Sequence, residues 1–173
     1  MMRRIIRIVV SPRAEWARIG AERAHAALVH AFTLSIIPAA ASFVMARNSD
    51  LEVPRNAVIA TYLGSLLTIY TVAAAFWLMV RLDSREAPLT RCMQVAAYGA
   101  TPVLLASVAL FTPVLVLVCV ITLPYVFYLY YLGVQELLRV PAHEASQFVA
   151  IALVAAFVAS SLGGAGIGVL GLL

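Results

Sequence analysis

Long apolar runs, separated by short charged segments, make up most of the chain. The longest lies between Arg91 and Glu136 and holds 44 residues without Asp, Glu, Lys or Arg. As one straight helix it would extend roughly 66 Å, whereas a bilayer core takes roughly 20 helical residues. The run therefore predicts a transmembrane hairpin that turns near Phe111-Thr112-Pro113, because proline suits the first turn of the returning helix.

The other apolar runs have the length of single spans. Together with the hairpin they predict five transmembrane helices in one domain, residues 1–173. The expected spans are approximately 24–46, 56–80, 93–111, 113–132 and 146–171. Composition agrees, because 64% of the residues are hydrophobic and only 12% are charged, against about 25% charged in soluble domains. The fold class is therefore an all-α, polytopic membrane protein.

A polar segment, residues 1–23, precedes the first span. Ser11 and Pro12 predict a helix start, with serine as the N-cap and proline in the first turn. The pattern predicts a short amphipathic helix lying in the membrane interface, with Trp16, Arg13 and Arg18 as interfacial residues. Because the apolar face is narrow, an ordinary solvated helix also fits.

The placement of arginine predicts the orientation. All 12 basic residues are arginines. With five spans and a cytoplasmic N-terminus, ten arginines lie inside and only Arg47 and Arg55 lie outside, which is a clear positive-inside bias. The C-terminus then faces outside. Since the arginines flank apolar runs and form no basic face, we expect no nucleic-acid partner.

Motifs for catalysis are scarce. The sequence contains no HExxH, CxxC or GxSxG pattern, so we predict no enzyme activity and assign no catalytic, cofactor-binding or metal-binding residue. No Asp or Glu lies within an expected span, which argues against ion-coupled pumping. His30 lies inside the first span and is either functional or a hydrogen-bonding partner of a neighbouring helix.

Small residues recur at every fourth position of the last span. Ala156, Ser160, Gly164 and Gly168 belong to this stripe, which includes a GxxxG pattern and predicts close helix packing. The contact could join two proteins or two helices of the same bundle.

The third span contains Ala97-Tyr98-Gly99-Ala100-Thr101-Pro102. Pro102 removes a backbone donor and can kink the helix, so Tyr98, Gly99, Thr101 and Pro102 form a candidate kink motif. A membrane-depth groove at this kink could hold a lipid tail.

The Ala97–Pro102 run occurs together with other features along the chain. In the order and spacing of these features, the sequence resembles the bacterial branch of the Yip (Ypt-interacting protein) domain family. The other features are Ser11-Pro12 with Trp16, the segment from Tyr128 to Gly133, and Val140-Pro141. The resemblance implies five spans and a cytoplasmic N-terminus. Eukaryotic relatives act in vesicle traffic, bind prenylated Rab-type GTPases and associate with one another. Their Asp-Leu-Tyr-Gly-Pro signature is missing here, which puts that partner class in doubt.

Three functions fit the sequence. The first is a non-enzymatic protein of the bacterial inner membrane that binds lipids, a membrane-protein partner or a second copy of itself. The second is a small transporter or channel subunit for a neutral solute, lined by polar faces of the second and third spans. The hydroxyl residues on those faces are Thr61, Ser65, Thr68 and Thr101. The third is an accessory subunit of a larger membrane complex.

Overall fold

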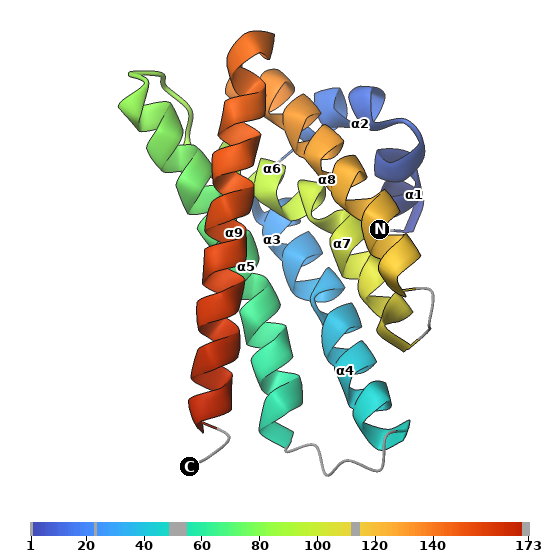
Figure 1. Ribbon diagram of the computed structural model, residues 1–173. Coiled ribbons are helices and arrows are strands. Elements are labelled where there is room, and N and C mark those ends of the chain that lie inside the picture. The colour runs from blue at the N-terminus through green and yellow to red at the C-terminus, as the bar shows by residue number, and fades with distance from the viewer. Residues whose placement is uncertain (1, 23, 49–54, 112–114, 171–173) are drawn as a thin grey trace.

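A computed structural model describes residues 2–22, 24–48, 55–111 and 115–170, and the regular structure within these ranges is helical. The helices in chain order are α1 Met2–Val10, α2 Pro12–Ile19, α3 Ala24–Leu34, α4 Ile36–Asn48, α5 Arg55–Leu82, α6 Leu89–Gly99, α7 Thr101–Ala106, the short 3₁₀ helix η1 Ser107–Phe111, α8 Leu115–Leu138 and α9 Ala142–Leu170. In Figure 1, α5 and α9 run antiparallel along one side, and α1 and α2 lie at the opposite side.

Four helical segments of the described chain are long and apolar enough to cross a membrane. They are His25–Val44, Val58–Leu82, Leu89–Ala109 and Ala142–Ala159. The expected span 113–132 falls mainly on α8, which is not among these four.

Two of these segments are interrupted near a proline. The first is divided into α3 and α4 at Ser35, where the sequence predicted one continuous helix, and Pro38 is the third residue of α4. The third is divided into α6 and α7 at Ala100, and Pro102 is the second residue of α7. A proline in the first turn of a helix leaves no hydrogen bond unmade, because that N–H has no partner within the helix.

Helix α5 is central to the packing. It contacts α4, α6 and α9, and it contributes Phe76, Val72 and Val80 to the buried core. Large apolar side chains on the outer faces remain exposed, among them Leu63 on α5 and Phe157 on α9. Extended apolar surfaces of this kind are typical of faces that contact lipid.

The C-terminus of α5 is closed by a Schellman motif. The backbone N–H of Arg85 donates to the carbonyl of Val80, and that of Ser84 donates to the carbonyl of Arg81. Ser84 has a φ of 54°, the left-handed conformation for which glycine is the usual residue.

The N-terminal segment contains two helices where the sequence predicted one. Helix α1 precedes Ser11 and α2 follows it, and the two helices pack on each other. Ser11 occupies the N-cap position of α2, but its side chain forms no capping hydrogen bond. We call α1 and α2 together the N-terminal hairpin.

Candidate functional site

The N-terminal hairpin is docked against the helices that carry the predicted motifs. Ile8 of α1 and Trp16 and Ile19 of α2 are fully buried, and α2 contacts α8. The hydroxyl of Tyr125 on α8 donates to the backbone carbonyl of Val9 at 2.6 Å. The hairpin is therefore part of the folded bundle.

Trp16 packs against a glycine of α8. A Cβ atom added to Gly133 would lie 2.9 Å from two ring carbons of Trp16, so only glycine leaves room for the indole. The interfacial prediction placed this face of α2 against lipid, but protein covers Trp16. Arg13 and Arg18, by contrast, are exposed.

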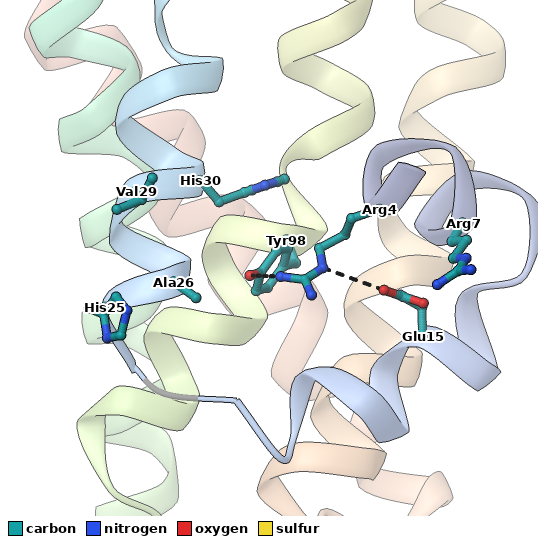
Figure 2. Close-up of a pocket in the computed structure, with 8 residues that line it drawn as sticks. All are labelled: Arg4, Arg7, Glu15, His25, Ala26, Val29, His30 and Tyr98. Carbon is teal, nitrogen blue, oxygen red and sulfur yellow. Dashed lines mark hydrogen bonds and ion pairs between the residues drawn. The ribbon is translucent and has the colours of Figure 1, made fainter. Parts of the chain in front are cut away.

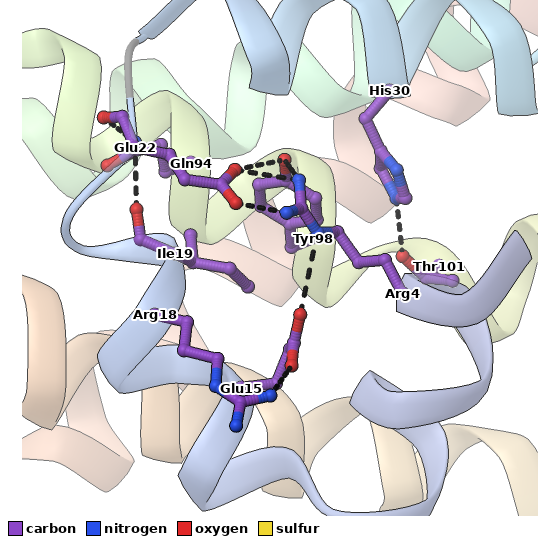
Figure 3. Close-up of polar contacts among 9 residues, drawn as sticks. All are labelled: Arg4, Glu15, Arg18, Ile19, Glu22, His30, Gln94, Tyr98 and Thr101. Carbon is purple, nitrogen blue, oxygen red and sulfur yellow. Dashed lines mark hydrogen bonds and ion pairs between the residues drawn. The ribbon is translucent and has the colours of Figure 1, made fainter. Parts of the chain in front are cut away.

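Tyr98 of α6 is the centre of a polar network with the hairpin (Figure 3). Arg4 of α1 donates to the Tyr98 hydroxyl at 3.1 Å, and that hydroxyl donates to Oε2 of Glu22 at 3.3 Å. Arg4 also pairs with the carboxylates of Glu22 and Glu15, the latter at 3.5 Å from Nε. The network joins α1 and α2 to the third apolar segment.

The charge of Arg4 is favoured by this environment. Burial alone would lower the pKa of Arg4, but Tyr98, Glu22 and Glu15 together raise it above its usual value. Because Glu15 is only 3% exposed, its carboxylate depends on Arg4 and on Arg18, whose Nη1 lies 3.5 Å away. The network is thus a set of paired charges.

Gln94 makes a second connection to the hairpin. Its side-chain amide donates to the backbone carbonyls of Ile19 and Glu22 at 3.3 and 3.2 Å. Gln94 and Tyr98 are four positions apart, so they lie on one face of α6, and the end of α2 packs over that face.

His30 of α3 contacts the same motif from the other side. Its Nε2 lies 2.9 Å from the hydroxyl oxygen of Thr101, and its ring centroid lies 4.4 Å from that of Tyr98. Both His30 and Thr101 are buried. Of the two interpretations left open by the sequence, this geometry favours a histidine that holds two helices together.

Gly99 and Pro102 complete the motif. A Cβ atom on Gly99 would lie 2.4 Å from two ring carbons of Tyr130 on α8, and the Tyr130 hydroxyl donates to the carbonyl of Ala96 at 3.3 Å. Gly99 therefore permits α6 and α8 to approach closely. Pro102 is buried next to the interruption at Ala100.

The predicted packing stripe on α9 is described only in part. Ala156 is half-buried against the core. Ser160, Gly164 and Gly168 lie on α9, but their side-chain surroundings fall outside the described part of the chain.

A pocket of about 480 Å³ lies between the hairpin and α3. Figure 2 shows Arg4, Arg7 and Glu15 on the hairpin side and residues of α3 on the other, with Tyr98 between them. The lining residues are Arg4, Arg7, Glu15, His25, Ala26, Val29, His30 and Tyr98. Its volume is within the range of small-molecule sites.

The side chains of the pocket are suited to binding and not to catalysis. His30 bonds to a threonine and not to a carboxylate, so it lacks the partner that would orient a general base. Within the described ranges, no group of three or more His, Cys, Asp or Glu side chains could hold a metal ion. The arrangement suits binding of a small polar or amphipathic group.

The sequence did not identify Arg4, Glu15, Glu22 or Gln94 as site residues. Gln94 could have been identified from the sequence. Its side-chain amide lies in an apolar run four residues before Tyr98, and a buried amide needs a hydrogen-bonding partner. The acidic residues gave no such signal, since they lie in a charged segment where exposure is the ordinary expectation.

The helices and their exposed apolar faces define a multi-pass α-helical membrane protein. Within this class, the Yip1 domain matches residues 6–163, and the chain belongs to that family. No curated protein and no solved structure matches the chain. Membership of the Yip family is thereby confirmed, and the match includes residues 6–19 of the hairpin.

Proposed function

We propose that this Yip-family chain is a non-enzymatic, five-span protein of the bacterial inner membrane that binds lipids, a membrane-protein partner or a second copy of itself. The observation that carries the proposal is the pocket between the docked hairpin and α3. It has cationic and apolar walls, and its lining includes Arg7, which is exposed.

The five-span topology takes α8 as the fourth crossing helix. Figure 1 supports it, because α2, the C-terminus of α5 and the link between α8 and α9 lie at one end of the bundle. Arg91 at the start of α6 is also close to the hairpin, since its Nη1 would lie 3.1 Å from a Cβ atom on Gly20. The segments richest in arginine therefore share an end, in agreement with a cytoplasmic N-terminus.

The absence of a catalytic role is inferred from how the polar groups are used. Tyr98, Arg4 and Glu22 bond to one another, and His30 bonds to Thr101. The Arg4–Tyr98 and His30–Thr101 contacts each connect two helices that are far apart in sequence. Such contacts stabilise a binding scaffold, and they leave no side chain placed as an activated nucleophile.

The transporter alternative is less well supported. A solute path needs hydroxyl groups that point into a common channel, whereas Ser65 donates to the carbonyl of Tyr62 at 2.8 Å and Thr68 to that of Gly64 at 2.9 Å. Thr101 is in contact with His30. These hydroxyls satisfy backbone groups or neighbouring helices, the usual role of Ser and Thr in membrane helices.

The test is purification of the full chain from its source membrane in native nanodiscs, followed by native mass spectrometry. The proposal predicts that a defined partner, a dimer or retained lipid travels with the chain. A monomer reproducibly free of partner and lipid would contradict it. Solute flux in proteoliposomes above that of empty vesicles would support the transporter, and fixed stoichiometry with one complex would support the accessory subunit.

A further inference from the structure

The pocket has the two kinds of surface that a phospholipid headgroup requires. Arg4, Arg7 and His25 offer nitrogen atoms at its walls, and Ala26 and Val29 offer apolar contacts. His25 begins the apolar segment His25–Val44, so the pocket lies where that segment enters the membrane. Phosphate groups of the bilayer occupy this depth, outside the hydrocarbon core.

One cation of the pocket is available to a ligand. Arg7 forms no ion pair or side-chain hydrogen bond within the part of the chain that the structure describes, and it is exposed. Arg4 is paired, but its Nε is buried and has no hydrogen-bond acceptor, since Glu15 Oε1 is 3.5 Å away. A ligand with oxygen acceptors could therefore bond directly to Arg7, and it would lie beside the positive charge of Arg4.

An apolar track continues from the pocket along the first span. Val29, Phe32 and Ile36 are 57%, 44% and 55% exposed. Their spacing of three and four residues places them along one side of α3 and the start of α4. An acyl chain attached to a phosphate in the pocket could lie on this track.

The acidic residue of the pocket decides which headgroup is preferred. The side chain of Glu15 is 4% exposed, and its carboxylate is already paired with Arg4 and Arg18. It is therefore not available to the ammonium group of a zwitterionic lipid, so a headgroup with a net negative charge fits better.

From these observations we infer that the pocket is a site for one anionic phospholipid, with the phosphate at Arg7 and Arg4 and an acyl chain along Val29 and Phe32. The inference rests on the proposed binding function and specifies its ligand. The lipid would lie between the N-terminal hairpin and α3, and its binding would hold these two elements together.

The experiment is a titration of the full-length protein in mild detergent with phosphatidylglycerol or phosphatidylcholine, with bound lipid counted by native mass spectrometry. We expect one tightly bound phosphatidylglycerol. Arg7→Gln should weaken its binding about tenfold, because a charge-assisted hydrogen bond is lost. Arg7→Lys should retain part of the affinity. Arg13→Gln is the matched control, since Arg13 is an exposed arginine of α2 outside the pocket, and it should bind as the unmodified chain does.

Three results would overturn the inference. Equal losses in Arg7→Gln and Arg13→Gln would indicate diffuse attraction to a basic surface, and equal affinity for phosphatidylcholine would remove the anionic preference. Glycerol 3-phosphate that binds as tightly as phosphatidylglycerol would make this a site for a soluble phosphate ester. Any of these alongside recovery of a partner or dimer from the source membrane would leave the proposed function intact. A chain that carries neither partner nor lipid would contradict the function itself.

Discussion

The hydroxyl of Tyr98 lies 3.1 Å from Nη1 of Arg4, although 94 positions separate the two residues. The same hydroxyl donates to Glu22, so one tyrosine on α6 connects α1 with the turn that follows α2. The contact with Arg4 ties α1 to α6 on one side of the pocket, and α3 lies on the other side. The wall of the pocket therefore depends on a tyrosine of the Tyr-Gly-Ala-Thr-Pro run.

Tyr98→Phe should destabilise the protein by about 1–2 kcal/mol, because Arg4 and Glu22 lose a shared partner in a partly buried place. Thermal unfolding in nanodiscs of fixed composition measures the change. Tyr128→Phe is the control, since Tyr128 is 39% exposed and its hydroxyl forms no hydrogen bond within the described ranges. Equal unfolding temperatures for the two variants would show that the hydrogen bonds of the Tyr98 hydroxyl do not stabilise the protein.

Gly99→Ala should lower stability by about 1–3 kcal/mol, the usual cost of inserting a methyl group into a packed core. The new Cβ atom would meet the ring of Tyr130 at 2.4 Å and push α6 away from α8. Gly64→Ala is the matched control, because nothing lies within 4 Å of its added Cβ. It should be neutral or stabilising, since alanine favours helix. The contact between α6 and α8 would be refuted if both variants unfolded at the same temperature.

The sequence predicted the all-helical fold class, because a bilayer demands continuous apolar runs of fixed length. It also identified Tyr98, Gly99, Thr101 and Pro102 as a unit, and the structure places all four at the interruption between α6 and α7. The sequence also indicates that α7 begins near Pro102, because proline lacks the backbone N–H that the interior of a helix requires.

The sequence did not predict that the N-terminal hairpin packs against the bundle. The amphipathic pattern predicts an interfacial Trp16, and nothing in the sequence indicates that Trp16 packs on Gly133. Glu15 belongs to a charged segment, yet it is buried through pairing with Arg4 and Arg18. Such pairings depend on tertiary packing, which hydrophobic periodicity does not encode.

His30 and Thr101 should show a coupling energy of about 0.6–1.7 kcal/mol in a double-mutant cycle, the range found for hydrogen bonds between membrane helices. The cycle compares His30→Phe, Thr101→Val and the double variant by unfolding in one detergent. The interaction is predicted because Nε2 and the hydroxyl lie 2.9 Å apart and both groups are buried. Additive effects would argue that the two side chains act independently.

Ser84→Gly should stabilise the protein by about 1 kcal/mol, because the left-handed conformation costs serine more than glycine. Ser84 has a φ of 54° and is exposed, so the change removes little packing. Ser84→Ala is the comparison variant, which keeps the Cβ and should bring no gain. A rise in unfolding temperature for alanine as large as that for glycine would contradict the explanation from backbone conformation.

The pocket and the lipid it is inferred to hold both require that the N-terminal hairpin is packed into the bundle, and the fluorescence of Trp16 tests this most directly. In a Trp77→Phe background Trp16 is the only tryptophan, and the protein can be reconstituted in vesicles with brominated lipids or exposed to aqueous iodide. Full burial against Gly133 predicts weak quenching by both agents. Strong quenching by brominated lipids would place Trp16 in the membrane interface, and strong quenching by iodide would place it in water; either result would contradict the docked hairpin.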